Sequence, residues 1–249
     1  MFTQLKRLWL QLYRGSKFRP LFYALLVIFI AAVVTKHFLV HPALTSWSTP
    51  VSGMVIAVDA GHGGPDGGAV SKSGIVEKEI NLLIARYLRD FLQESGAIVV
   101  MTRDDDKDLA DENPPGSRKT QDLHRRADII KESGAELLVS VHLNSMNSSR
   151  WTGAQTFYYS GHQTSKYLAV FIQDELQQNL QNTKRAAKSA DTIYLLKSAS
   201  IPSVLVEACF LSNPQEAELL NDMDYQKQIA ASIYQGILRF VTEKDKLPK

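Results

Sequence analysis

The sequence predicts an α/β domain in which helices cover both faces of a mixed, largely parallel sheet. Three observations predict this fold. Short apolar runs alternate with helical segments, glycine or polar residues end the runs, and no internal repeat is evident. Strands separated by helices form βαβ units, because parallel neighbours need a crossover connection. In such sheets, ligand sites gather beyond the carboxyl ends of the strands.

The elements follow one another in a regular order. The expected strands are residues 54–59, 97–103, 136–142, 154–160 and 203–210. The first helix is predicted from apolar side chains at three- and four-residue spacing and is expected to end at Gly96. Its apolar positions are Ile80, Leu83, Ile84, Tyr87, Leu88, Phe91 and Leu92. Three further helices are expected over residues 120–133, 164–180 and 224–243.

The N-terminus has the pattern of an export signal or membrane anchor. Residues 1–19 hold five basic side chains and no acidic one, and residues 20–34 carry no charge. This run is shorter than the ~20 residues that usually span a bilayer, but Lys36 could snorkel and extend it. No small-residue cleavage site follows closely, so we expect an uncleaved signal-anchor and a catalytic part outside the cytoplasm. A buried core helix is the alternative.

Three parts are therefore expected along the chain. Residues 1–41 form the basic N-terminus and hydrophobic signal-anchor, residues 42–53 a linker, and residues 54–249 the catalytic domain. The net charge of +2 is too small to indicate nucleic-acid binding. Cys209 is the only cysteine, so no intramolecular disulfide can form. It lies in an apolar strand, where a cysteine usually packs as a small hydrophobe and only rarely acts as a nucleophile.

Polar side chains at strand and helix ends are the candidates for chemistry. His62 follows the first strand, Glu77 opens the first helix, and His142 ends the third strand. Two imidazoles and a carboxylate can hold one Zn²⁺ and leave a position open for water. Each residue has a structural alternative: a turn residue, a helix N-terminal charge or a core histidine.

Glu207 lies within the apolar strand SVLVEACF. A carboxylate in such a strand is costly unless it is paired or points into a polar site. If it faces a metal site, burial would raise its pKa and suit it to proton transfer. A salt-bridged structural glutamate is the alternative.

Four segments together resemble the zinc-dependent N-acetylmuramoyl-L-alanine amidases of the Amidase_3 type. They are AVDAGHGGPDGGAV, IVEKEINLLIARYLRDFL, LHRRADIIKESGAELLVSVHLNS and IPSVLVEACFLSNPQEAELL. The resemblance covers about residues 54–242 and implies one zinc per domain, held by His62, Glu77 and His142, with Glu207 as the catalytic glutamate. Arg126 falls on the family's arginine and is expected to have a structural or substrate-supporting role.

The resemblance also implies a substrate and partners. The family hydrolyses the amide between the lactyl group of N-acetylmuramic acid and L-alanine in peptidoglycan. The short anchor and the absence of wall-binding repeats resemble the germination-specific amidases of spore-forming bacteria, which act in cortex maturation towards muramic δ-lactam. An activator protein is a further expectation, and residues 104–118 are its candidate contact surface, or a solvated loop.

Two other functions fit parts of the pattern. One is a catalytically inert or partner-dependent peptidoglycan-binding regulator with an amidase fold, which would normally lack a ligand or the glutamate. The other is a zinc peptidase or deacetylase acting on another wall bond. The family's common residues differ at Ala60, Leu143 and Cys209, and none of these positions removes a ligand.

Overall fold

The computed structural model describes residues 19–40 and 49–246, which belong to two separate units divided after Trp47. In the first unit, helix α2 (Arg19–Val40) contains the expected apolar run. Its apolar side chains from Leu21 to Val33 are largely exposed. Among the described residues, no helix reaches the length and hydropathy needed to cross a membrane. The basic flank at 1–18 and most of the expected linker, residues 42–48, lie outside the described residues.

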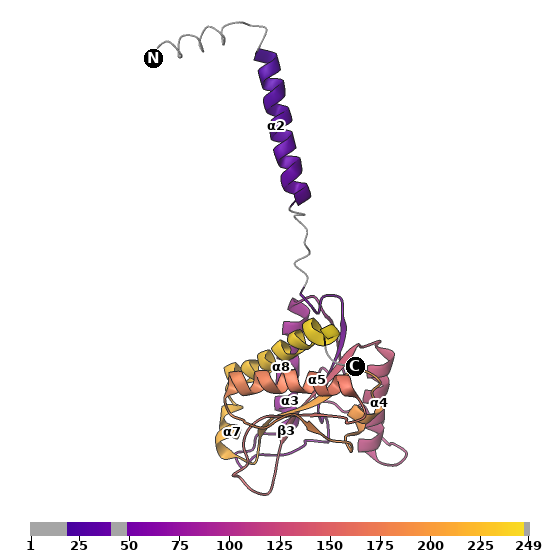
Figure 1. Ribbon diagram of the computed structural model, residues 1–249. Helices are drawn as coiled ribbons and strands as arrows, with labels where there is room; N and C mark the ends of the chain where they lie inside the picture. Colours follow the sequence, from indigo (N-terminus) through magenta and orange to yellow (C-terminus); the bar gives the residue numbers. More distant parts are fainter. Residues whose placement is uncertain (1–18, 41–48, 247–249) are drawn as a thin grey trace. The chain divides into compact units, whose positions relative to one another are not determined.

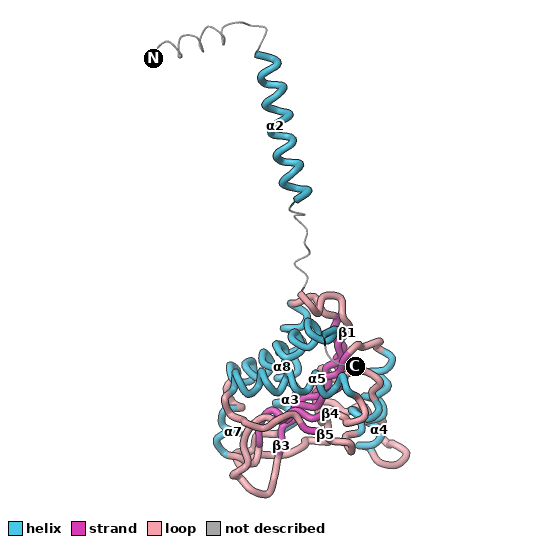
Figure 2. Tube along the Cα trace, in the orientation of Figure 1, coloured by secondary structure: helices cyan, strands magenta, loops and turns pink. Residues whose placement is uncertain are grey.

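The second unit contains a six-stranded sheet in the order β2-β1-β3-β6-β4-β5 (Figures 1 and 2). Its strands are β1 (Val55–Ala60), β2 (Ile98–Met101), β3 (Leu137–Asn144), β4 (Gln155–Tyr158), β5 (Lys188–Ser189) and β6 (Ser203–Phe210). The first four strands in the sheet order run parallel, β4 runs antiparallel to β6, and β5 is parallel to β4. The predicted mixed, largely parallel sheet is therefore confirmed.

Helices pack on both faces of this sheet, as predicted. One face carries α3 (Glu77–Glu94), α5 (Gln163–Leu180) and α8 (Met223–Glu243), which lie close together in Figure 1. The other face carries α4 (Arg118–Glu132) and the short α6 (Tyr194–Ser198). The short α7 (Pro214–Leu219) follows β6, and the 3₁₀ helix η1 (Lys244–Lys246) follows α8.

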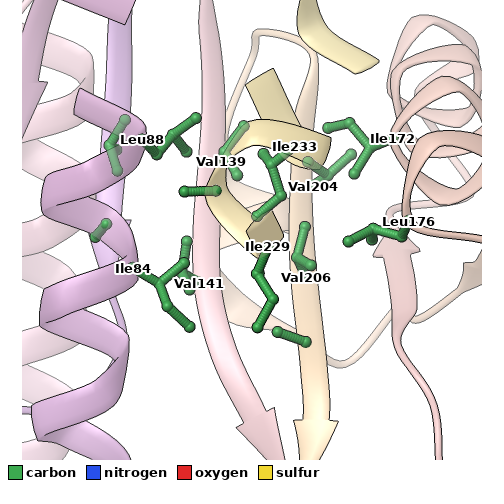
Figure 3. Packing of buried hydrophobic residues seen from close by; sticks show 14 of the residues in the cluster. Ile84, Leu88, Val139, Val141, Ile172, Leu176, Val204, Val206, Ile229 and Ile233 are labelled. Carbon is green, nitrogen blue, oxygen red and sulfur yellow. The ribbon is translucent and has the colours of Figure 1, made fainter. Parts of the chain in front are cut away.

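The larger core lies between the sheet and α3, α5 and α8. Alternate residues of β3 and β6 point into it, because successive side chains of a strand face opposite sides. Figure 3 shows the apolar side chains that meet there, including Ile84, Leu88, Val139, Val141, Ile172, Leu176, Val204, Val206, Ile229 and Ile233. The intervening residues of β3 and β6 face α4 and α6, so His142 and Glu207 lie on the face opposite this core.

Local sequence signals explain where several elements begin. Asn213 caps α7 with its side chain and is followed by Pro214, which favours the first helical position. Asp222 caps α8, and Ser117 caps α4. At the end of the expected linker, residues 49–53 form a turn in which Val51 is fully buried.

Candidate metal centre

The carboxyl ends of β1 and β3 bring two histidines to the start of α3. His62 follows β1, His142 lies near the end of β3, and Glu77 is the first residue of α3. Nε2 of His62 and Nδ1 of His142 each lie 3.2 Å from Oε1 of Glu77. One ligand atom from each side chain lies within 4.8 Å of the others. This donor set matches the nitrogen and oxygen ligands of a zinc site.

Glu77 is fixed by backbone groups as well as by the histidines. Its two oxygens accept hydrogen bonds from the amides of Ala69, at 2.9 Å, and Leu143, at 3.1 Å. Burial raises the pKa of Glu77, but the neighbouring imidazoles of His142 and His62 outweigh this effect and lower it. The carboxylate therefore stays ionised, which is the form that binds a metal ion.

The loop that carries His62 has a demanding conformation. His62 has a φ of 63°, in a region that non-glycine residues rarely adopt. A Cβ on Gly61 would lie 2.2 Å from Cε1 of His142, so only glycine leaves room for that ring. Gly68 has a φ of 69°, and its Cβ would lie 2.6 Å from Oε2 of Glu77. The glycines of this loop therefore let backbone and ligands approach closely.

A buried arginine on α4 forms hydrogen bonds with the backbone of the same loop. Arg126, on α4, is 1% exposed and donates to the carbonyls of Ala60, at 2.8 Å, and His62, at 2.6 Å. Its other partners are the carboxylates of Asp59 and Asp122, both at 2.8 Å. The guanidinium therefore connects the end of β1, the loop that carries His62, and its own helix.

Three further residues of this site, Arg103, Asn81 and Asp66, carry at most a weak signal in the sequence. Arg103 donates to the carbonyls of Ala60 and Gly61, and Asn81 donates to Gly61 and Glu77. Oδ2 of Asp66 lies 3.0 Å from Nδ1 of His62 and can orient that ring. Asp66 stands four residues after His62, and this spacing within a glycine-rich turn was the one hint available.

Glu207 lies beside the histidine and carboxylate cluster. It pairs in register with His142 across β3 and β6, and its Oε2 is buried without a hydrogen-bond partner in the described part of the chain. Burial, with a smaller contribution from the charge of Glu77, raises the pKa of Glu207 to about 7. An unpartnered carboxyl oxygen next to the three ligand groups fits a site completed by a metal ion and water.

Cys209 is placed away from this chemistry. Its side chain is fully buried, and its Sγ lies 3.5 Å from Oη of Tyr225 on α8. Burial, together with the nearby charge of Glu216, raises the pKa of the thiol. The thiolate is therefore disfavoured, in agreement with the expected packing role.

Comparison with known proteins identifies the family. A family model described as N-acetylmuramoyl-L-alanine amidase matches residues 56–239. The chain belongs to this amidase family. It is 50% identical over 205 residues to the germination-specific N-acetylmuramoyl-L-alanine amidase of Bacillus subtilis, and the alignment covers 82% of this chain and 86% of the relative.

Solved structures of amidases share the fold. The CwlD amidase from Clostridioides difficile, determined in complex with the GerS lipoprotein, matches with a TM-score of 0.74 and 43% identity. That match covers 76% of this chain and 98% of CwlD. An N-acetylmuramoyl-L-alanine amidase from Clostridium difficile 630 matches with a TM-score of 0.69 and 30% identity, over 78% and 99% of the two chains.

Proposed function

We propose that the protein is a zinc-dependent N-acetylmuramoyl-L-alanine amidase that separates the stem peptides of peptidoglycan from muramic acid. The observation that carries this proposal is the convergence of His62, Glu77 and His142 beside Glu207, within a chain of the amidase family. The three residues would hold one Zn²⁺. When bound, zinc supplies an activated water and polarises a carbonyl oxygen.

The side chains around this site would position the ion and transfer the proton. Glu77 keeps its charge and, with the two imidazoles, fixes the position of the ion. Glu207 has a pKa of about 7, so its carboxyl can accept a proton from water and return it to the leaving amine near neutral pH. Oδ2 of Asp66 lies 3.0 Å from Nδ1 of His62, and Arg126 donates a hydrogen bond to the backbone carbonyl of the same residue.

The proposed biological role is maturation of the spore cortex for germination, on a route towards muramic δ-lactam. It is supported by 50% identity to a germination-specific amidase over most of both chains. Residues 1–41 are proposed as an uncleaved membrane anchor that places residues 54–249 outside the cytoplasm. The basic and apolar sequence pattern and the exposed apolar side chains of α2 support this proposal.

A protein partner is also proposed. The CwlD amidase, 43% identical to this chain, was determined in complex with a lipoprotein. We therefore infer that a lipoprotein of similar kind binds this chain. Co-purification of the full-length chain with such a lipoprotein from the same organism, followed by activity with and without it, tests this inference. Equal activity and separate elution of the two proteins would argue against it.

The decisive experiment is digestion of purified peptidoglycan by the full-length protein, with zinc or with a chelator, followed by mass spectrometry. Zinc-dependent release of stem peptides with free L-alanine termini is expected. Release of acetate, with glucosamine residues left in the glycan, would instead indicate a deacetylase. Loss of bound zinc in His142→Ala, but not in the matched variant His124→Ala on the exposed side of α4, would support the ligand set.

A further inference from the structure

A row of residues leads from Glu207 across the sheet to its outer edge. Glu207 on β6 pairs with Gln155, the first residue of β4, and Nε2 of Gln155 donates to the carbonyl of Ala186. Leu205 pairs with Phe157, which in turn pairs with Lys188 of β5. Paired residues of neighbouring strands point to the same face, so Lys188 lies on the face of the sheet that carries Glu207.

Three basic residues occupy this edge, and we call them the basic edge: Lys184, Arg185 and Lys188. Lys184 and Lys188 are exposed, and neither forms an ion pair with any described residue. Arg185 is half-buried, and its guanidinium lies 5.4 Å from the ring centre of Trp151 and 5.3 Å from that of Phe210. The two aromatic rings therefore fix the direction of this side chain.

The guanidinium of Arg185 has unused donors. Its Nε donates to the carbonyl of Thr152 at 3.2 Å, whereas its two terminal nitrogens have no hydrogen-bond partner within residues 49–246. A hollow of about 450 Å³ adjoins it, lined by Thr152, Gln181, Asn182, Thr183, Lys184 and Arg185. The charge of Arg185 already acts on the carboxyl of Glu216, and its free donors beside a polar hollow are suited to a second carboxylate.

The spacing suits the proposed substrate. Neighbouring strands lie ~4.8 Å apart, so the segment before β5, two strands from β6, lies roughly 10 Å from Glu207. An extended peptide advances ~3.4 Å per residue, and the γ link of isoglutamate lengthens the next step. The second and third residues of a stem peptide therefore lie at least ~7 Å and ~10 Å beyond the scissile amide. Those residues are the ones that carry free carboxylates when the stem contains isoglutamate and diaminopimelate.

We propose that the basic edge binds the carboxylates of the second and third residues of the stem peptide and so selects acidic stems over amidated ones. This inference rests on the proposed function, since the scissile amide must lie at Glu207 for the spacing to apply. Charge complementarity supplies the preference, and the exposed position of two of the cations makes it dependent on ionic strength.

The test compares two synthetic substrates with the full-length, zinc-loaded protein. One is N-acetylmuramoyl-L-alanyl-isoglutamyl-diaminopimelate, which has three free carboxylates. The other is the same compound with the isoglutamyl α-carboxylate and the side-chain carboxylate of diaminopimelate amidated. In Lys184→Gln/Lys188→Gln, kcat/KM for the acidic substrate should fall about five- to tenfold, through KM, with less than about a twofold change for the amidated one. Raising the salt concentration should reduce the preference of the unmodified protein. Equal changes for both substrates, or no change for either, would overturn the inference.

A matched control and a binding measurement keep the two proposals separable. Lys244→Gln/Lys246→Gln removes two exposed cations in η1 and should leave both substrates unaffected. Titration of the acidic and amidated peptides, without the sugar, measures the preference in the absence of turnover. Tighter binding of the acidic peptide with no cleavage of either substrate, with or without the proposed lipoprotein partner, would contradict the amidase proposal and leave only the binding preference of the basic edge. Cleavage of both substrates, with equal binding of the two peptides, would support the amidase proposal and overturn the proposed role of the basic edge.

Discussion

Nη2 of Arg126 donates a hydrogen bond to the carbonyl oxygen of His62 over 2.6 Å. A buried cation on α4 thus holds the backbone of His62, a residue that has a positive φ. The same guanidinium is paired with Asp59, whose side chain is 1% exposed. Arg126 therefore supports both the backbone of this loop and the charge of Asp59, together with Arg103, which donates to the carbonyls of Ala60 and Gly61.

Replacing Arg126 with lysine tests this dependence. Lysine keeps the charge but cannot direct hydrogen bonds to Asp122, Asp59 and His62 at once. We expect the melting temperature to fall by several degrees and zinc affinity to fall about 10- to 100-fold. Calorimetry and competition with a chelator measure the two effects. Arg125→Lys, at a half-buried neighbour paired with Asp111, is the control and should change neither. Unaltered zinc affinity in Arg126→Lys would show that the hydrogen bond from Arg126 to His62 does not position the loop for zinc binding.

Gly61→Ala tests the contact between the metal loop and the ring of His142. The added methyl would lie 2.2 Å from that ring, so the imidazole or the loop must move. We expect zinc binding to weaken at least tenfold. Gly67→Ala is the matched control in the same loop, because its Cβ would lie 3.4 Å from a methyl of Val76, an ordinary contact. Equal zinc affinity in both variants would show that the close approach is unimportant.

Glu207→Gln separates proton transfer from metal binding. Glutamine has nearly the same shape but cannot take up a proton, so kcat should fall by about 10²–10⁴ while bound zinc stays constant. Zinc content by atomic absorption and turnover on the acidic muramoyl peptide give the two readouts. Turnover at the level of the unmodified protein would exclude Glu207 from the chemistry.

Asp59 links stability to acid pH. Burial raises the pKa of Asp59, but Arg126 and hydrogen bonds from Ser140 and Thr102 outweigh this and lower it to about 2. Because the folded pKa is depressed, its contribution is complete above the unfolded value of ~3.9 and is lost as the pH falls towards 2.

The measurement is urea unfolding of the unmodified protein and of Asp59→Asn. The difference in their free energies of unfolding should shrink by about 1 kcal/mol between pH 6 and pH 3. A difference that stays constant over this range would mean that Asp59 is not held ionised by the fold.

The sequence predicted the sheet and the clustering of His62, Glu77 and His142, because apolar runs and strand-end positions are local signals. Local signals also set the limit of prediction. The exposure of Leu83, at 37%, and the burial of Leu82 show that the three- and four-residue pattern did not fix which leucine of α3 faces the core. Helices α6 and α7 are too short for a periodic pattern to be recognised.

The supporting residues of the site depended on long-range contacts. Arg103 and Arg126 reach the same loop from the end of β2 and from α4, and both donate to the carbonyl of Ala60. Their separation in sequence from that loop hides this relation, and a basic residue after a strand or on a helix is ordinary. The antiparallel direction of β4, which places Gln155 beside Glu207, likewise became known only from the pairing.

The register that pairs His142 with Glu207 is also the register that buries Val206 and Ala208 in the larger core. A slip of one residue between β3 and β6 would turn the carboxylate towards α5 and α8 and expose two apolar side chains. A redesign of the larger core that keeps the alternation of apolar residues in β3 and β6 therefore also keeps Glu207 beside His142. The same coupling should conserve the pairing of His142 with Glu207 in evolution, because a mutation that shifts the register also destabilises the fold.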